Sequence, residues 1–94
     1  MPSLIRSDAK TFTHSNYATS TSPATKTLPA NTTSILIHNV DATIGLLVSF
    51  DAGTTFKALA AGASLSMDCN ALTSYVIKSA SGTPSAECLY GVEG

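Results

Sequence analysis

Few side chains in this 94-residue sequence have the type and spacing needed for catalysis or metal binding. The only imidazoles are His14 and His38, and neither lies at a metal-ligand spacing from Cys69 or Cys88. Six carboxylates are spread over the whole chain, which leaves few opportunities for a paired general acid and base. The sequence also lacks a Gly-x-Ser-x-Gly, a phosphate-binding loop and a His-Glu-x-x-His pattern. We therefore expect no catalytic residue, no metal and no cofactor, and we predict that the protein is not an enzyme.

One segment, Ser49-Phe-Asp-Ala-Gly-Thr-Thr-Phe56, resembles the Asp-box, a Ser-x-Asp-x-Gly-x-Thr-aromatic hairpin found in sialidase propellers and other β proteins. All five specified positions match: Ser49, Asp51, Gly53, Thr55 and Phe56. A carboxylate such as Asp51 accepts hydrogen bonds from the amides of a tight loop, and Gly53 adopts positive φ without strain. A propeller needs several such hairpins and this chain has no internal repeat, so the resemblance implies a structural hairpin and not an enzyme. A calcium site at Asp51 is disfavoured, because Ca²⁺ takes roughly six to eight oxygen ligands and the loop has one carboxylate.

The two cysteines, Cys69 and Cys88, are too few for a disulfide scaffold. The apolar alternation around Cys69 favours two small buried side chains, and the alternative is one bridge between neighbouring strands.

The composition restricts the partners of the protein. Charged residues make up 12% of the chain, against about 25% in an average soluble protein. A formal charge of −1 gives no electrostatic reason to bind nucleic acid or anionic lipid. No apolar run approaches the roughly 18 residues that span a bilayer, and residues 1–8 lack the apolar core of a secretory signal. We expect neither nucleic acid nor a membrane as a partner.

From residue 34 onward, short apolar segments alternate with turn signals. Residues 63–69 alternate fully, which predicts that Ala63, Leu65, Met67 and Cys69 face inward. Further strands are predicted at residues 34–40, 43–50, 74–79 and 85–90. No segment keeps helical spacing over three turns. The pattern predicts an all-β fold, either a small antiparallel β-sandwich of the jelly-roll or immunoglobulin-like type or a barrel.

Residues 1–33 have a different character, because they hold 13 of the 26 Ser and Thr residues and few apolar side chains. Residues 11–15 are compatible with one short strand. Residues 15–27 are predicted to be irregular, since hydroxyl side chains compete for backbone hydrogen bonds and Pro23 removes a donor. We therefore divide the chain into an extended Ser/Thr-rich N-terminal arm, residues 1–33, and a β-sandwich domain, residues 34–94.

The arm has two interpretations, a disordered tail or a segment that becomes ordered only against a neighbouring subunit. The second is favoured by apolar side chains that are unusual in a solvating tail. They are the candidate partner-binding anchors Leu4, Ile5, Phe12 and Tyr17.

Residues 48–91 resemble small virion structural proteins of tailed bacteriophages. The resemblance rests on the hairpin and on three later segments: Leu59-Ala-Ala-Gly-Ala-Ser-Leu-Ser66, Tyr75-Val-Ile-Lys-Ser-Ala-Ser-Gly-Thr83 and Leu89-Tyr-Gly91. Ala52 stands where such hairpins more commonly have glycine, and residues 1–33 have no counterpart. The resemblance implies a β-sandwich particle protein, most often a capsid decoration (cement) protein or a tail component.

The predicted function is that of a capsid decoration protein, which stabilises the shell by docking of the sandwich and by arm exchange with neighbours. The implied partners are the major capsid protein or other virion proteins, and further copies of the chain. The implied location is the virion, assembled in the host cytoplasm. The alternative is a tail, neck or fibre component that acts as a receptor- or carbohydrate-binding module.

Overall fold

The computed structural model describes residues 10–70 and 72–93, and every regular element among them is a β-strand. The strands are β1 (Lys10–Ala18), β2 (Ala24–Thr27), β3 (Thr32–Asn39), β4 (Leu46–Ser49), β5 (Lys57–Leu59), β6 (Ser64–Asp68), β7 (Ser74–Ser79) and β8 (Ser85–Glu93). Within these described ranges there is accordingly no helix of the length and apolar character that crosses a membrane.

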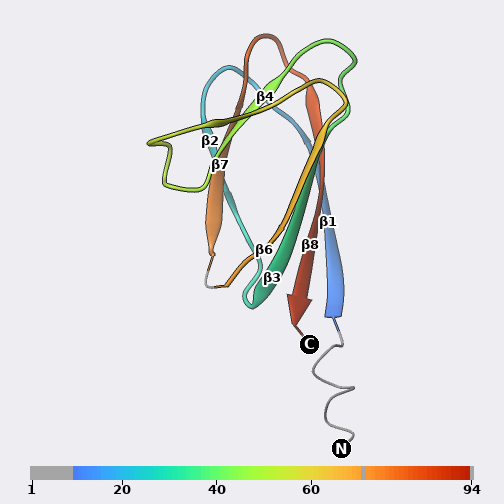
Figure 1. Ribbon diagram of the computed structural model, residues 1–94, viewed down its shortest axis with the longest axis vertical. Coiled ribbons are helices and arrows are strands. Elements are labelled where there is room, and N and C mark those ends of the chain that lie inside the picture. Colours follow the sequence, from blue (N-terminus) through green and yellow to red (C-terminus); the bar gives the residue numbers. More distant parts are fainter. Residues whose placement is uncertain (1–9, 71, 94) are drawn as a thin grey trace, which may run out of the picture.

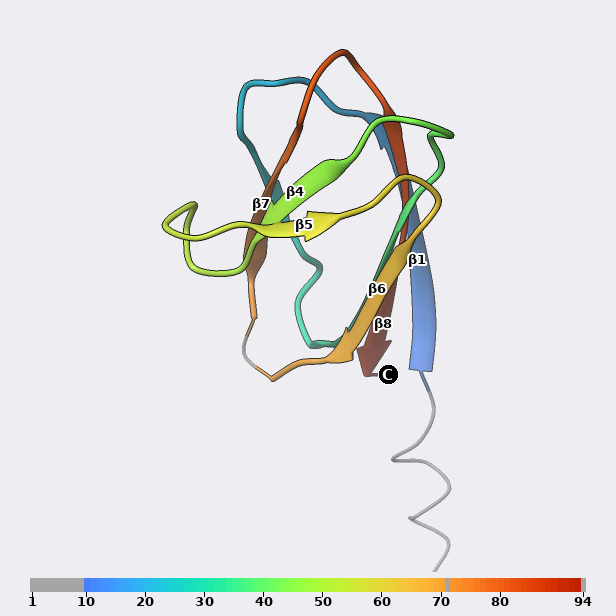
Figure 2. The same ribbon diagram turned by 45° about the horizontal axis from the view of Figure 1, so that its top comes forward.

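The strands form two four-stranded antiparallel sheets that face each other (Figure 1). Sheet A has the order β1-β8-β3-β6, and sheet B has the order β2-β7-β4-β5. The chain passes from one sheet to the other at nearly every connection, and only β4 and β5 follow each other within one sheet (Figure 2). Eight strands wound in this order make a jelly roll. The predicted all-β antiparallel sandwich is therefore confirmed.

The hydrophobic core lies between the two sheets. Alternate residues of each strand point into this space, because successive side chains of a strand face opposite sides of its sheet. The buried apolar side chains are Leu28, Ile35, Ile37, Leu46, Val48, Leu59, Tyr75, Val76, Ile77, Ala86, Cys88 and Tyr90.

The strands predicted after residue 34 are largely present. Along β6 the serines Ser64 and Ser66 are exposed and the intervening Leu65 is half-buried, so the predicted alternation is confirmed. Strand β7 spans the predicted residues 74–79, and β8 continues three residues beyond the predicted end, to Glu93. Strand β4 is shorter than predicted and covers only Leu46–Ser49.

The structure corrects the division of the chain at residue 33. Strand β1 pairs with β8 from Lys10 to Ala18, and β2 pairs with β7. Residues 10–33 are thus an integral part of both sheets. Of residues 15–27, which were predicted to be irregular, only residues 19–23 lie outside a strand. The reason is that β1 and β2 are edge strands. An edge strand exposes more of its surface than a central strand, so hydroxyl-rich sequences are compatible with it. Residues 1–9 lie outside the described part of the chain.

Asn39, at the end of β3, joins the two sheets. Its side chain is fully buried, and its Nδ2 donates hydrogen bonds to the carbonyl oxygens of Ile44, Leu59 and Ala60 at 2.9, 3.2 and 3.2 Å. Its Oδ1 accepts a hydrogen bond from the amide of Asp41 at 3.1 Å. One side chain of sheet A therefore satisfies carbonyls that lie before β4 and at the end of β5 in sheet B.

Candidate functional site

The outer face of sheet A, which points away from the core, is defined by the register of its four strands. Each strand contributes one residue to each of three rows across this face. The rows are Phe12–Gly91–Ser34–Asp68, His14–Leu89–Leu36–Ser66 and Asn16–Glu87–His38–Ser64. We use the name "outer face of sheet A" for these residues.

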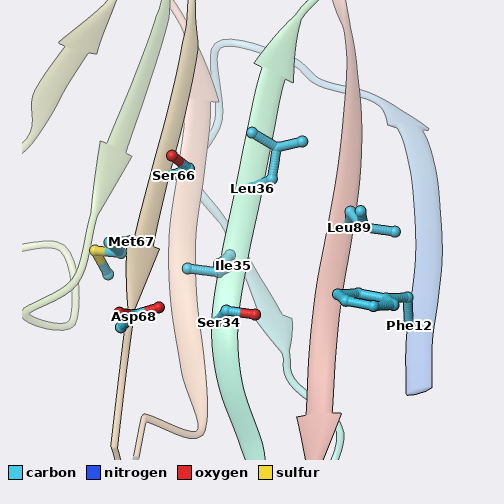
Figure 3. A pocket seen from close by; sticks show the side chains of 8 residues that line it. All are labelled: Phe12, Ser34, Ile35, Leu36, Ser66, Met67, Asp68 and Leu89. Carbon is cyan, nitrogen blue, oxygen red and sulfur yellow. The ribbon is translucent and has the colours of Figure 1, made fainter. Parts of the chain in front are cut away.

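An apolar centre, formed by Phe12, Leu36 and Leu89, occupies the middle of this outer face (Figure 3). Phe12 is 56% exposed and is one of two large exposed hydrophobic side chains among the described residues. Leu36 and Leu89 are half-buried. The solvent side of an antiparallel sheet is normally polar, so three adjoining apolar side chains on three strands are unusual there. Such patches commonly mark contact surfaces for other proteins or ligands.

The ring of Phe12 extends from β1 across β8 (Figure 3). It lies against Gly91, its partner in the strand pairing, which is itself buried. A Cβ atom at position 91 would lie 3.1 Å from Cε1 of Phe12 and would collide with Oγ of Ser34. The absence of a side chain at Gly91 therefore leaves room above β8 for the Phe12 ring, which stays 56% exposed.

Two shallow hollows, of about 450 and 490 Å³, lie side by side on the outer face and share Leu36 and Leu89. The first is bounded by Phe12 and Asp68, and the second by residues that include His14 and Glu87. Both are open to solvent and lined by apolar floors with polar rims. Their shape fits side chains of another polypeptide better than a small molecule, because small-molecule sites enclose most of the ligand surface.

The rim of this face carries a histidine–carboxylate pair. His38 Nδ1 lies 3.8 Å from Glu87 Oε1 across the β3–β8 pairing, and both side chains are substantially exposed. This contact gives His38, a residue of β3, a partner on the neighbouring strand β8. Glu87 and Asp68 give the rim two carboxylates, at opposite ends of the apolar centre.

The four predicted arm anchors have different environments. Leu4 and Ile5 lie outside the described residues. Phe12 and Tyr17 both belong to β1 but point to opposite faces of sheet A: Phe12 is exposed on the outer face, whereas Tyr17 is half-buried and packs against the core. The structure therefore does not bring Phe12 and Tyr17 together, and only Phe12 is available to a partner at the outer face.

Tyr17 belongs to a hydrogen-bonded cluster that contains all three tyrosines of the chain. The hydroxyl of Tyr75 lies 2.6 Å from that of Tyr17 and 2.7 Å from that of Tyr90, and 3.4 Å from Sγ of Cys88. Burial raises the pKa of all three phenols above the usual value, most strongly that of Tyr75. The cluster connects β1 and β8 of sheet A to β7 of sheet B, so its hydrogen bonds link the two sheets across the core.

The 49–56 segment forms the loop between β4 and β5, and its polar residues converge on Asp51. Oδ1 of Asp51 accepts hydrogen bonds from Oγ of Ser49 at 2.6 Å and from the amide of Thr55 at 2.9 Å, and Oδ2 accepts one from the Thr55 hydroxyl. The Ser49 hydroxyl, followed by the Thr55 hydroxyl and amide, lowers the pKa of Asp51 to about 2. Gly53 has a φ of 85°, as the motif predicts. Phe56 is half-buried, with Nζ of Lys78 4.5 Å from its ring centroid.

Other candidate chemistry is sparse in the described residues. No three His, Cys, Asp or Glu side chains of residues 10–70 and 72–93 come together as a metal site. The thiol of Cys88 is buried in the core, as predicted, whereas Cys69 is half-buried, with Sγ 3.6 Å from the carbonyl oxygen of Thr32.

Sequence reasoning did not single out Leu36 or Leu89 as surface residues. The signal was present in residues 34–40, which are apolar on both faces: inward-facing Ile35 and Ile37 place Leu36 and His38 outward. Such a strand has no polar face to mark its solvent side, and the structure shows that β3 has one face in the core and one in the apolar centre.

No family model matches the chain, and no curated protein matches it. One similar solved structure comes from the work described as "Bacillus endospore appendages form a novel family of disulfide-linked pili". The two chains are 12% identical, with a TM-score of 0.55, and the alignment covers 90% of this chain and 89% of that one. The likeness extends over nearly the whole of both chains and concerns their fold alone.

Proposed function

We propose that this protein is a non-enzymatic structural subunit of a repeating protein assembly, and that the assembly is the virion of a tailed bacteriophage, where the chain decorates the capsid. The observation that carries the proposal is the apolar centre of Phe12, Leu36 and Leu89 on the outer face of sheet A. Because exposed apolar groups gain free energy when they leave water, this centre favours contact with another protein surface.

Two further observations support a role in assembly. The structurally similar protein belongs to appendages described as pili, so a chain of this fold occurs in a repeating structure elsewhere. Strands β1 and β6 are the two edges of sheet A, and edge strands offer main-chain groups to neighbouring chains. The phage assignment itself depends on the resemblance of residues 48–91 to small virion proteins.

The partners in this proposal are the major capsid protein and further copies of the chain. A single contact through an apolar centre of three side chains is weak, and such contacts become stable when they are repeated over a shell. The outer face has only two carboxylates and no dense charge along its rows, which suits a protein partner more than a nucleic acid.

The test is the copy number of the chain in purified particles, measured by quantitative mass spectrometry against the major shell protein. A copy number comparable with that of the shell protein is expected for a decoration protein. A copy number typical of a neck, baseplate or fibre contradicts the capsid assignment and favours the alternative of a receptor- or carbohydrate-binding tail component. Absence of the chain from particles overturns the virion proposal.

A further inference from the structure

The outer face of sheet A is too small to hold two copies together by itself. With strands about 4.8 Å apart and a rise of about 3.4 Å per residue, its three rows cover on the order of 350 Å². A stable protein interface buries about 800 Å² on each partner. Direct packing of two such faces therefore gives only a weak contact, and a stable one needs additional polypeptide.

Residues 1–9 supply polypeptide of complementary chemistry. They carry the apolar pair Leu4 and Ile5, followed by Arg6. The outer face offers the apolar centre for the first two side chains, and Asp68 or Glu87 for the guanidinium. Arginine pairs well with carboxylates at the rim of an interface, where it adds specificity to apolar burial.

The position of β1 favours a neighbouring copy over the same chain as the acceptor. Lys10 starts β1 opposite Glu93, at the end of the sheet next to the row of Phe12. A segment that continues the direction of β1 leads away from its own outer face, and it returns only if the chain reverses within residues 7–9. Nine extended residues reach at most about 30 Å, which is enough to cross the face of a copy placed beyond that end.

We propose that the outer face of sheet A in one copy binds residues 1–9 of the next copy, with Leu4 and Ile5 covering the apolar centre and Arg6 pairing with a rim carboxylate. This deepens the proposed function by naming the self-association site, although it is tested on the purified chain alone. The donor segment and the acceptor face are different surfaces, so each bound pair of copies leaves one donor and one acceptor unused. Such a heterologous contact propagates from copy to copy.

Complementation between two variants of the full chain tests the proposal. The donor variant, Leu4→Ser with Ile5→Ser, keeps the acceptor face. The acceptor variant, Leu36→Thr with Leu89→Thr, keeps the donor segment, and threonine suits an outward strand position. In sedimentation velocity the unaltered chain should associate with rising concentration, and each variant alone should associate more than about tenfold more weakly, because apolar burial is lost. An equimolar mixture should form a 1:1 complex and nothing larger.

Two controls make the result interpretable. Val40→Thr removes the other large exposed apolar side chain, which lies outside the outer face of sheet A, and it should leave association unchanged. Circular dichroism and thermal unfolding show whether the acceptor variant is folded, and Leu89→Thr alone serves as the milder variant if it is not.

Several results would overturn the inference. They are a monomeric unaltered chain at every concentration, undiminished association of the donor variant, and a mixture that remains monomeric. The second result indicates direct face-to-face packing, and the first is compatible with binding of residues 1–9 in the same chain. The copy number in particles is independent of all three, so a failure of the virion proposal is distinguishable from a failure of this one.

Discussion

The ring of Phe12 lies against Gly91, its partner across the β1–β8 pairing, with Cε1 only 3.1 Å from the position that a Cβ atom of residue 91 would take. An aromatic residue opposite a glycine covers the backbone that the glycine leaves bare, which stabilises the pairing of an edge strand. The same contact keeps Phe12 on the surface, where it forms part of the apolar centre. One cross-strand pair thus contributes both to the stability of β1 and to the candidate interaction surface.

Substitution of Gly91 by alanine should destabilise the protein by about 1–3 kcal/mol, since the new Cβ collides with the Ser34 hydroxyl and crowds the Phe12 ring. Urea unfolding followed by circular dichroism measures the change. In a Ser34→Ala background the same substitution should cost less, because the colliding oxygen is gone. An equal cost in both backgrounds would show that the Ser34 contact is not the cause.

Tyr75→Phe should destabilise the fold by about 1–3 kcal/mol, because the phenols of Tyr17 and Tyr90 lose a hydrogen-bond partner inside the protein. Tyr17→Phe is the matched control and should cost less, as Tyr17 is only half-buried and its removal leaves the Tyr75–Tyr90 bond intact. Chemical denaturation of both variants provides the comparison. Equal losses for the two would contradict a central role for Tyr75.

Alkaline pH should unfold the protein and ionise its tyrosines together. Burial raises the pKa of Tyr75, Tyr17 and Tyr90 above that of the unfolded chain, about 10. Their contribution to stability is therefore complete below about pH 10 and is lost as the pH rises further. Phenolate absorbance and far-ultraviolet circular dichroism should change at the same pH. Phenolate formation in a protein that keeps its strands would refute this prediction.

The β4–β5 loop should stay ordered at a pH at which an aspartate with the usual pKa would already be protonated. Hydrogen bonds from Ser49 and Thr55 lower the pKa of Asp51 to about 2. Since the pKa of an unfolded aspartate is about 3.9, the stabilising effect is complete above about pH 4 and is lost as the pH falls through about 2. The amide chemical shift of Thr55, followed by NMR, should titrate with that low midpoint. Asp51→Asn should abolish the transition, and a midpoint near 3.9 would mean that the hydrogen bonds do not hold the carboxylate.

Asn39→Leu should destabilise the protein by about 3 kcal/mol, because it leaves several buried backbone groups unsatisfied. Asn39→Asp should be worse at neutral pH, where it buries a charge and removes the Nδ2 donor. Thermal unfolding at neutral and acidic pH checks both variants. The aspartate variant should recover partly on acidification, as protonation removes the charge; identical stability at the two pH values would count against this explanation.

Local sequence patterns predicted the strands in which polar and apolar side chains alternate or which turn residues delimit. In β6 the serines alternate with apolar residues, and β7 is bounded by turn residues, so both could be found from the sequence. Strand β2 and the second half of β1 have no such alternation. They are strands because β7 and β8 supply partners for their backbone groups, and these partners lie about fifty or more residues away in the sequence.

The Asp51 loop could be predicted residue by residue, since its hydrogen bonds join positions at most four residues apart and short spacing fixes their geometry. The outer face of sheet A could not, because its residues come from four strands and are assembled only by the sheet order.

The sequence by itself determined the all-β character, the inward set of β6 and the turn at Gly53, because each depends on local conformational preference and on alternation within one segment. Only the tertiary structure decided that residues 10–33 belong to the sandwich, that three tyrosines share one hydrogen-bonded cluster, and that Phe12 joins Leu36 and Leu89 in one apolar centre. Those features depend on which strands become neighbours, and that choice is made by the free energy of burying the whole core at once rather than by any single segment.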